Sequence, residues 1–154
     1  MQISFEQPGR IGPGALVVGV LDGGELAWAS QNALRFHGRV AYERAYNGLA
    51  LDAGEGDRLA ASVRDADVIF LANHGVIVCG PSVAYAFDDL YYLERACMLQ
   101  VLAHGGPRPL KTVPEEVARA TRAQMDGERQ QSTLHLDALK RILDREQPGW
   151  RGQR

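Results

Sequence analysis

The chain has 154 residues, of which 45% are hydrophobic and 23% are charged, and its formal net charge at pH 7 is −2. This length and apolar content suit one domain with its own core, and they exclude a collagen-like or wholly disordered chain. Seventeen Lys and Arg residues against 19 Asp and Glu residues leave no basic excess for nucleic acid. There is neither a signal peptide nor an apolar run near the roughly 18 residues that a membrane span needs. We therefore expect a soluble, cytoplasmic protein that binds neither nucleic acid nor membrane.

The first segments of the chain predict little regular structure. Residues 1–14 are polar and rich in Gly and Pro, which is typical of a mobile arm. Residues 15–21 form a β-branched run that ends at the turn signal of residues 22–24, so GELAWAS (residues 24–30) is predicted to return as the second strand of a hairpin.

A short helical turn and a strand around Arg39–Tyr42 are predicted next. A helix follows, because Asp52 and Glu55 have the spacing of a capping box. Its apolar positions are few and it stops at Asp65, so we expect it to lie on a surface.

The clearest pattern lies in the middle of the chain. Residues 68–72 (VIFLA) and 75–80 (GVIVCG) are continuous apolar runs, which are typical of strands buried on both faces. Asn73, His74 and Gly75 interrupt these runs, and they are too polar or too small for a core strand. The break should place the His74 side chain at a defined and partly open point.

A long helix is predicted from about Ser82 to Ala103, since its apolar residues recur every three or four positions. The residues expected to face the sheet are Val83, Phe87, Leu90 and Cys97. Asp88 and Asp89 are expected on the opposite, polar side. Cys79 and Cys97 have no CxxC spacing and are expected to be buried, reduced thiols.

The last predicted helix is polar, spans about Glu115 to Arg145 and is interrupted near Gly127. Residues 148–154 look like a frayed tail. No internal repeat or long linker divides the chain, which indicates one domain.

None of the four histidines lies two or four residues from another, so the chain has no local zinc pair of the HxH or HExxH type. His74 is the candidate functional residue because Gly75 lets a ligand approach the backbone beside it. A structural role for His74 remains open at this point. His104 suits the end of a helix, and His37 and His135 have no special setting.

The stretch LANHGVIVCGPSVAYAFDDLYYLERACMLQ resembles the C-terminal half of the class II aldolase/adducin family, and the likeness extends over about residues 30–145. The resemblance implies an α/β fold, a three-layer α/β/α sandwich, and a homo-oligomer that is commonly a tetramer. Enzymes of this family hold a divalent metal, usually zinc, with three histidines. By motif match His74 corresponds to the third of these ligands.

The same resemblance also points to missing parts. The family's HxH pair, its acid/base glutamate and its phosphate-binding loop belong to an N-terminal half that residues 1–29 do not replace. The expected division is therefore a divergent segment 1–29, a family-like C-terminal portion 30–147 and a tail 148–154, so the fold would be a truncated one. One histidine is too few for catalytic zinc, so no catalytic residue is assigned and zinc binding by the chain alone is expected to be weak.

Three hypotheses remain for function. The first is a domain related to zinc-dependent aldolases, which are aldehyde-lyases acting on small sugar-phosphate or hydroxy-carbonyl substrates, with little activity of its own. The second is a non-catalytic, adducin-like assembly domain. The third is a generic α/β domain with its own small ligand. Because a half-family chain leaves apolar surface without its usual cover, we also expect a homo-oligomer.

Overall fold

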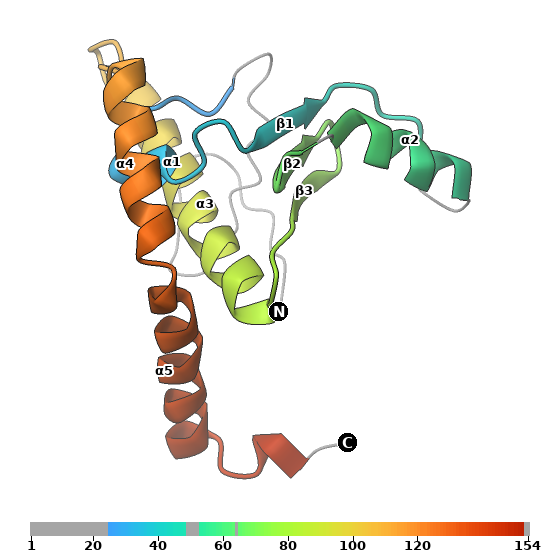
Figure 1. Ribbon diagram of the computed structural model, residues 1–154, viewed down its shortest axis with the longest axis vertical. Coiled ribbons are helices and arrows are strands. Elements are labelled where there is room, and N and C mark those ends of the chain that lie inside the picture. The colour runs from blue at the N-terminus through green and yellow to red at the C-terminus, as the bar shows by residue number, and fades with distance from the viewer. Residues whose placement is uncertain (1–24, 49–52, 64, 153–154) are drawn as a thin grey trace.

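The computed structural model describes residues 25–48, 53–63 and 65–152 (Figure 1). The expected arm and the first strand of the expected hairpin lie outside these ranges. The elements, in chain order, are α1 (Gln31–Leu34), β1 (Val40–Glu43), α2 (Ala53–Val63), β2 (Val68–Leu71), β3 (Gly75–Val78), α3 (Val83–His104), α4 (Glu115–Gly127), α5 (Gln130–Glu146) and a 3-10 turn (Trp150–Gly152). No helix in the described ranges has the length and apolar character to cross a membrane.

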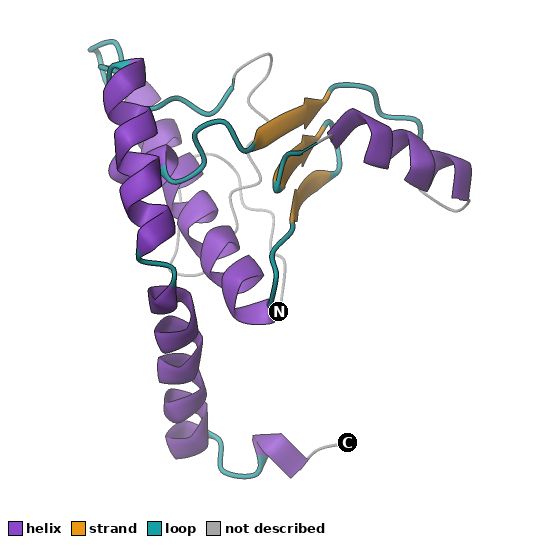
Figure 2. Ribbon diagram, viewed as in Figure 1, coloured by secondary structure: helices purple, strands orange, loops and turns teal. Residues whose placement is uncertain are grey.

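The three strands form one small mixed sheet in the order β1-β2-β3. β1 runs parallel to β2, with Val40 opposite Val68, and β2 runs antiparallel to β3. α2 lies on one side of the sheet, whereas α1, α3 and α4 lie on the other (Figures 1 and 2). The predicted α/β class is therefore confirmed, and so are the two predicted central strands and the strand before them.

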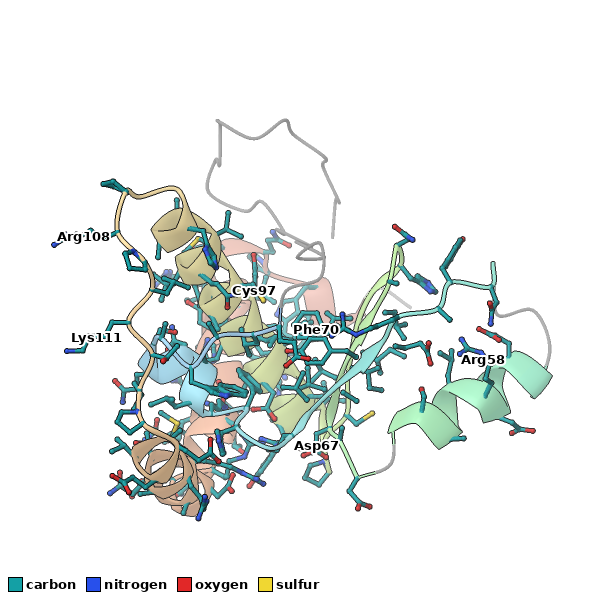
Figure 3. All side chains as sticks on the ribbon, turned by 90° about the horizontal axis from the view of Figure 1, so that it is seen from above. Arg58, Asp67, Phe70, Cys97, Arg108 and Lys111 are labelled. Atoms are coloured by element: carbon teal, nitrogen blue, oxygen red, sulfur yellow. The ribbon has the colours of Figure 1, made fainter. Side chains whose placement is uncertain are left out.

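The core lies between α1, the sheet and α3. Its fully buried members include Phe36 after α1, Val68 in β2 and Leu93 in α3, and Cys97 packs with them. Phe70 stacks on Tyr42 with ring centroids 5.4 Å apart. Figure 3 shows Phe70 and Cys97 in the interior, between the sheet and the helices. α3 therefore packs across the sheet through its middle turns.

The two central strands differ in burial, contrary to the expectation that both are buried on both faces. Three of the four β2 residues are buried, but those of β3 are half-buried or exposed, and Ile77 is 38% exposed. The reason is position in the sheet, since β3 follows β2 and is paired with no other described strand. Cys79, just past this strand, is exposed, so the prediction that it is buried was wrong.

The first turns of α3 correct the predicted orientation of that helix. Val83 is 78% exposed, whereas Asp88 and Asp89 are 1% and 0% exposed. This part of α3 packs against α5 instead of the sheet, and Phe87 faces His135 of α5 with ring centroids 5.6 Å apart. The apolar spacing identified the helix correctly but gave the wrong partner for its N-terminal half.

Residues 25–30 form no strand, so the predicted return strand was wrong. Their backbone groups form hydrogen bonds with side chains from other elements instead. The Ala27 N–H donates to Gln100 Oε1 at 2.7 Å, Gln100 Nε2 donates to the Glu25 carbonyl, and the Leu26 N–H donates to the Tyr42 hydroxyl at 2.6 Å. The segment is thereby held against α3 and β1 as a loop.

The predicted interruption of the last helix is confirmed. α4 ends at Gly127 and α5 begins at Gln130, and Arg129 lies at the break. The loop from α3 to α4 carries Arg108 and Lys111, which project outward (Figure 3). After this break, α5 packs against the first turns of α3.

Candidate functional site

His74 lies in the tight turn between β2 and β3, at the end of a buried strand. Its backbone N–H donates to the Leu71 carbonyl at 3.2 Å. Asn73 has φ +54° and Gly75 has φ +146°, so both neighbours occupy the region that favours Asn and Gly over other residues. The turn therefore fixes the backbone of His74, whose side chain is exposed.

A hollow of about 20 Å³ lies beside His74, between the end of β1, the loop after it and α2. Two carboxylates and one guanidinium line it with His74. Arg58 pairs with Glu43 (Nη1 to Oε2, 2.9 Å) and with Glu55 (Nη2 to Oε1, 2.7 Å).

These contacts keep both acids ionised. The Ala45 N–H, with help from Ser62 and Arg58, holds the pKa of Glu43 below its usual value, and Arg58 does the same for Glu55. An acid with a lowered pKa is a poor proton donor at neutral pH. The pair can present negative charge beside His74, but it is not tuned for general acid catalysis.

The described residues do not assemble a complete metal centre. Within the described ranges, no group of three or more His, Cys, Asp or Glu side chains is placed to hold an ion. A catalytic zinc needs three protein ligands. His74 has the exposure and the chemistry of one such ligand, and the described part of the chain supplies no second and third beside it.

Two of the other three histidines have structural partners. His37 Nε2 lies 2.9 Å from Glu115 Oε2, and its ring meets the edge of Trp28, which ties α1 to α4. His135 Nδ1 lies 2.7 Å from Asp88 Oδ1. The expectation that these two have no special setting was therefore wrong. His104 is exposed in the last turn of α3, where a basic residue was expected.

Cys97 is unsuited to nucleophilic catalysis. It is 9% exposed in the core, and burial raises the pKa of its thiol to about 11. At neutral pH the group is a thiol, whereas a nucleophile must be a thiolate. This agrees with its predicted role as a small apolar residue.

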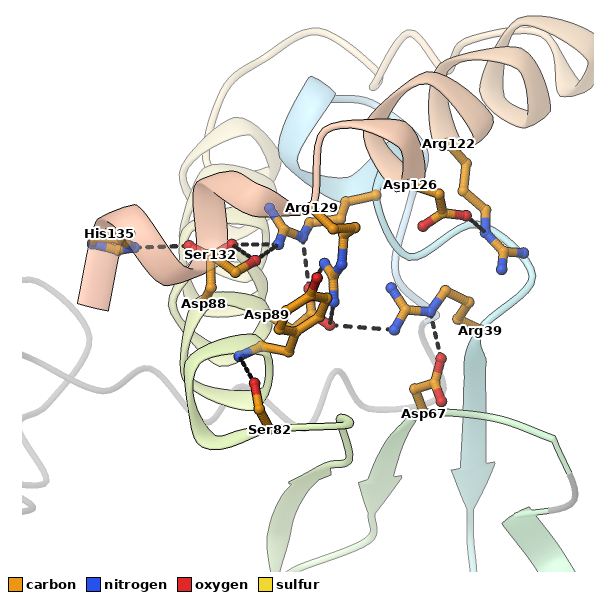
Figure 4. A network of polar contacts seen from close by, with 12 residues as sticks. Arg39, Asp67, Ser82, Asp88, Asp89, Arg122, Asp126, Arg129, Ser132 and His135 are labelled. Carbon is orange, nitrogen blue, oxygen red and sulfur yellow. Dashed lines mark hydrogen bonds and ion pairs between the residues drawn. The ribbon is translucent and has the colours of Figure 1, made fainter. Parts of the chain in front are cut away.

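A buried polar cluster joins α1, α3 and α5 (Figure 4). At its centre lie Asp88 and Asp89 of α3. Asp89 accepts four hydrogen bonds from three arginines: one from Arg35 Nε (2.6 Å), one from Arg39 Nη2 (3.2 Å) and two from Arg129 (2.6 and 2.8 Å). Arg35 and Arg39 lie in the segment between α1 and β1, and Arg129 lies at the start of α5, so one carboxylate joins two distant parts of the chain.

Asp88 has a different set of partners. It accepts hydrogen bonds from Arg35 Nη2 and from the Ser132 hydroxyl, the latter at 2.8 Å, besides its contact with His135. Burial would raise the pKa of both aspartates. For Asp88 the bonds from His135, Ser132 and Arg35 outweigh burial, and for Asp89 those from Arg129 and Arg35 do so, which leaves both pKa values below the usual one.

The amino-acid pattern gave no sign of this cluster. Arg35 and Arg129 lie 54 and 40 residues from Asp89, so local spacing carries no trace of their pairing. The one available signal was the adjacent Asp pair inside a long and mostly apolar helix. Because the two residues are charged, they were expected to face solvent.

The comparisons with known proteins agree on one family. The sequence profile of the Class II Aldolase and Adducin N-terminal domain matches residues 13–101. A protein of Pseudomonas aeruginosa named as an aldolase class 2 protein is 35% identical over 127 residues, which cover 79% of this chain and 49% of that protein. The crystal structure of an aldolase II superfamily protein from Pseudomonas syringae has a TM-score of 0.69 and 38% identity, covering 79% of this chain and 49% of that one.

A more distant structure shares the fold. L-fuculose 1-phosphate aldolase from Glaciozyma antarctica PI12 has a TM-score of 0.65 at 23% identity, covering 80% of this chain and 47% of that one. The chain thus spans about half the length of the relatives it matches. The matched profile covers more than half of the chain, and two of these relatives exceed 30% identity. The chain belongs to the class II aldolase and adducin family.

Proposed function

We propose that the chain contributes one metal-ligand histidine, His74, to a site of the aldehyde-lyase type that acts on small sugar-phosphate or hydroxy-carbonyl substrates. By itself it binds zinc weakly and cleaves no aldol. The observation that carries this proposal is the exposed His74 on a constrained turn, without two companion ligands in the described part of the chain.

The family is generally metal-dependent, and a bound zinc would polarise a substrate carbonyl. The described residues do not fit a complete centre of this kind, because His74 lacks two further ligands near it. We therefore derive no catalytic step through a metal. What the described residues offer is one imidazole that can act as a metal ligand and, beside it, two carboxylates that are already paired with Arg58.

The proposal is tested by titrating the protein with zinc while following the imidazole signals of its histidines by NMR. His74→Ala is compared with the wild type, and His104→Ala is the matched control because His104 is also exposed but lies at the end of α3. We expect weak binding that shifts the His74 signals, is lost in His74→Ala and is retained in His104→Ala. Cleavage of small sugar phosphates should be absent in all three proteins.

Two results would contradict it. Equal zinc binding in the wild type and His74→Ala would remove His74 as a ligand. Tight one-to-one binding together with turnover, both abolished in His74→Ala, would mean that other residues complete a working site in this chain.

A second candidate is an adducin-like assembly role as a homo-oligomer. It is supported by large apolar side chains exposed on three helices: Leu102 (57%), Val117 (45%), Leu134 (59%) and Ile142 (40%). Exposed apolar surface favours burial against a partner. Sedimentation velocity should show an oligomer at micromolar concentration, and Leu134→Glu should shift it toward monomer. A stable wild-type monomer would contradict this role.

A further inference from the structure

A second hollow lies on the opposite side of the molecule's core from the sheet, between α1, α4 and α5. Its volume is about 410 Å³, which is within the range of small-molecule sites. Side chains that bear on its chemistry are Arg35, Tyr92, Thr121, Gln124, Arg129 and Ser132. It shares no lining residue with the hollow beside His74.

The lining of this hollow is polar, and its charge comes mainly from two guanidinium groups. Seven of its eleven side chains carry an amide or hydroxyl group, which can both donate and accept a hydrogen bond, whereas Arg35 and Arg129 can only donate. Glu128 is the single carboxylate in the lining and Met125 its single apolar side chain. A ligand that carries acceptor oxygens satisfies the two guanidinium groups, and the amide and hydroxyl groups can adapt to it.

Two guanidinium groups in the lining are held in fixed orientations. Arg35 and Arg129 each direct one edge at the buried aspartates of α3. Each also stacks on a tyrosine, Arg35 on Tyr92 at 4.8 Å and Arg129 on Tyr85 at 4.7 Å from the ring centroid. Because both side chains are already ordered, binding a ligand costs little further side-chain entropy.

The guanidinium groups still have donors to offer. Among the described residues, Arg35 Nη1 and Arg129 Nε have no hydrogen-bond partner, and neither atom is buried. Arginine forks match the geometry of carboxylate and phosphate oxygens. Asp88 and Asp89 neutralise the two positive charges at the opposite edges of the guanidinium groups. Recognition of an anion therefore depends on these directed N–H groups more than on excess positive charge.

We infer that this hollow binds a small organic anion, whose carboxylate or phosphate oxygens accept hydrogen bonds from Arg35 and Arg129 and whose other oxygens accept from Thr121 and Gln124. Such a site needs no metal and is independent of the role proposed for His74. It gives the α1–α4–α5 side of the fold a binding function of its own.

The test uses two probes, inorganic phosphate and malonate, titrated at constant ionic strength and followed by NMR of backbone and Gln side-chain amides. Arg35 and Arg129 also hold Asp88 and Asp89, so their replacement would disturb the fold. The charge of the hollow is varied instead at Gln124, which is exposed on α4.

We expect saturable shifts at Thr121, Gln124 and Ser132 with one probe or both, and the stronger probe identifies the anion. Gln124→Glu should weaken binding about fourfold and Gln124→Lys should strengthen it by a similar factor, as expected for one unit charge close to an exposed site. Ala123→Glu adds the same charge on the same helix outside the lining and should have a smaller effect. Shifts that do not saturate with either probe would overturn the inference, as would equal effects of Gln124→Glu and Ala123→Glu.

Discussion

The two polar regions of this molecule are built in opposite ways. Around Asp88 and Asp89, charged groups from α1, α3 and α5 are buried and bonded to one another. Around His74, the backbone is constrained by the conformations of Asn73 and Gly75 but the side chain is exposed. Substituting one residue of the buried cluster leaves its partners without a hydrogen-bond partner. Substituting His74 should instead have little effect on the fold.

The buried cluster is better explained by specificity than by net stability. Removing charges from water costs about as much as their pairing returns, so a complete buried network adds little net free energy. An incomplete one is costly, because a charge remains buried without its partner. The Asp89 carboxylate thus favours the arrangement of helices that brings its three arginines together and disfavours others.

The largest effect is expected from Asp89→Asn. The amide accepts fewer hydrogen bonds and carries no charge, so three arginines lose their common acceptor, and the free energy of unfolding should fall by about 3–5 kcal/mol. Urea unfolding measures the change. Asp137→Asn is the control, since Asp137 forms a partly exposed ion pair with Lys140 in the next turn, and its loss should cost less than about 1 kcal/mol. Equal losses in the two variants would show that the buried cluster is no more critical than a surface pair.

Acid should weaken the cluster selectively. Both aspartates have a pKa below the usual value, so their stabilising contribution is complete above the unfolded pKa of about 3.9 and is lost as the pH falls through the lower folded pKa. The wild type should therefore lose more stability than Asp88→Asn when the pH is lowered from about 5 to about 3. Urea unfolding across this range gives both slopes, and parallel slopes would contradict the assignment.

A smaller effect is expected at the turn. Gly75→Ala places a Cβ in open space, but φ +146° is unfavourable for any residue with a side chain, so the free energy of unfolding should fall by about 1–2 kcal/mol. Gly127→Ala is the matched control, because Gly127 ends α4 without a positive φ and also has open space around it. That variant should be neutral or more stable by up to about 1 kcal/mol. Thermal unfolding of both would test the expectation, and destabilisation by Gly127→Ala alone would refute it.

Sequence patterns predicted where the helices and strands lie better than they predicted which elements pack against one another. The apolar runs at residues 68–72 and 75–80 and the three- and four-residue spacing of α3 were sufficient to locate strands and helix, because both depend on local periodicity. The break at Gly127 was also visible. The residue pattern around His74 correctly indicated an interruption between two strands.

Features that depend on distant partners were not predicted. Asp88 and Asp89 were assigned to solvent because nothing near them in sequence reveals Arg35 or Arg129. Residues 25–30 resembled a strand, yet Gln100 of α3 takes up their backbone groups. In both cases a side chain from far along the chain decides the local structure, and a local pattern contains no record of it.

The position of the cluster in the chain has a consequence for how the protein is made. Arg35 precedes Asp88 by 53 residues, and Ser132 follows it by 44. During synthesis from the N-terminus, α3 is complete long before Arg129 and Ser132 exist, and its two aspartates stay without those partners until α5 emerges from the ribosome. The helices can therefore reach their final arrangement only after α5 has been synthesised, and a nascent chain that stops before Arg129 would leave Asp88 and Asp89 of α3 without these partners.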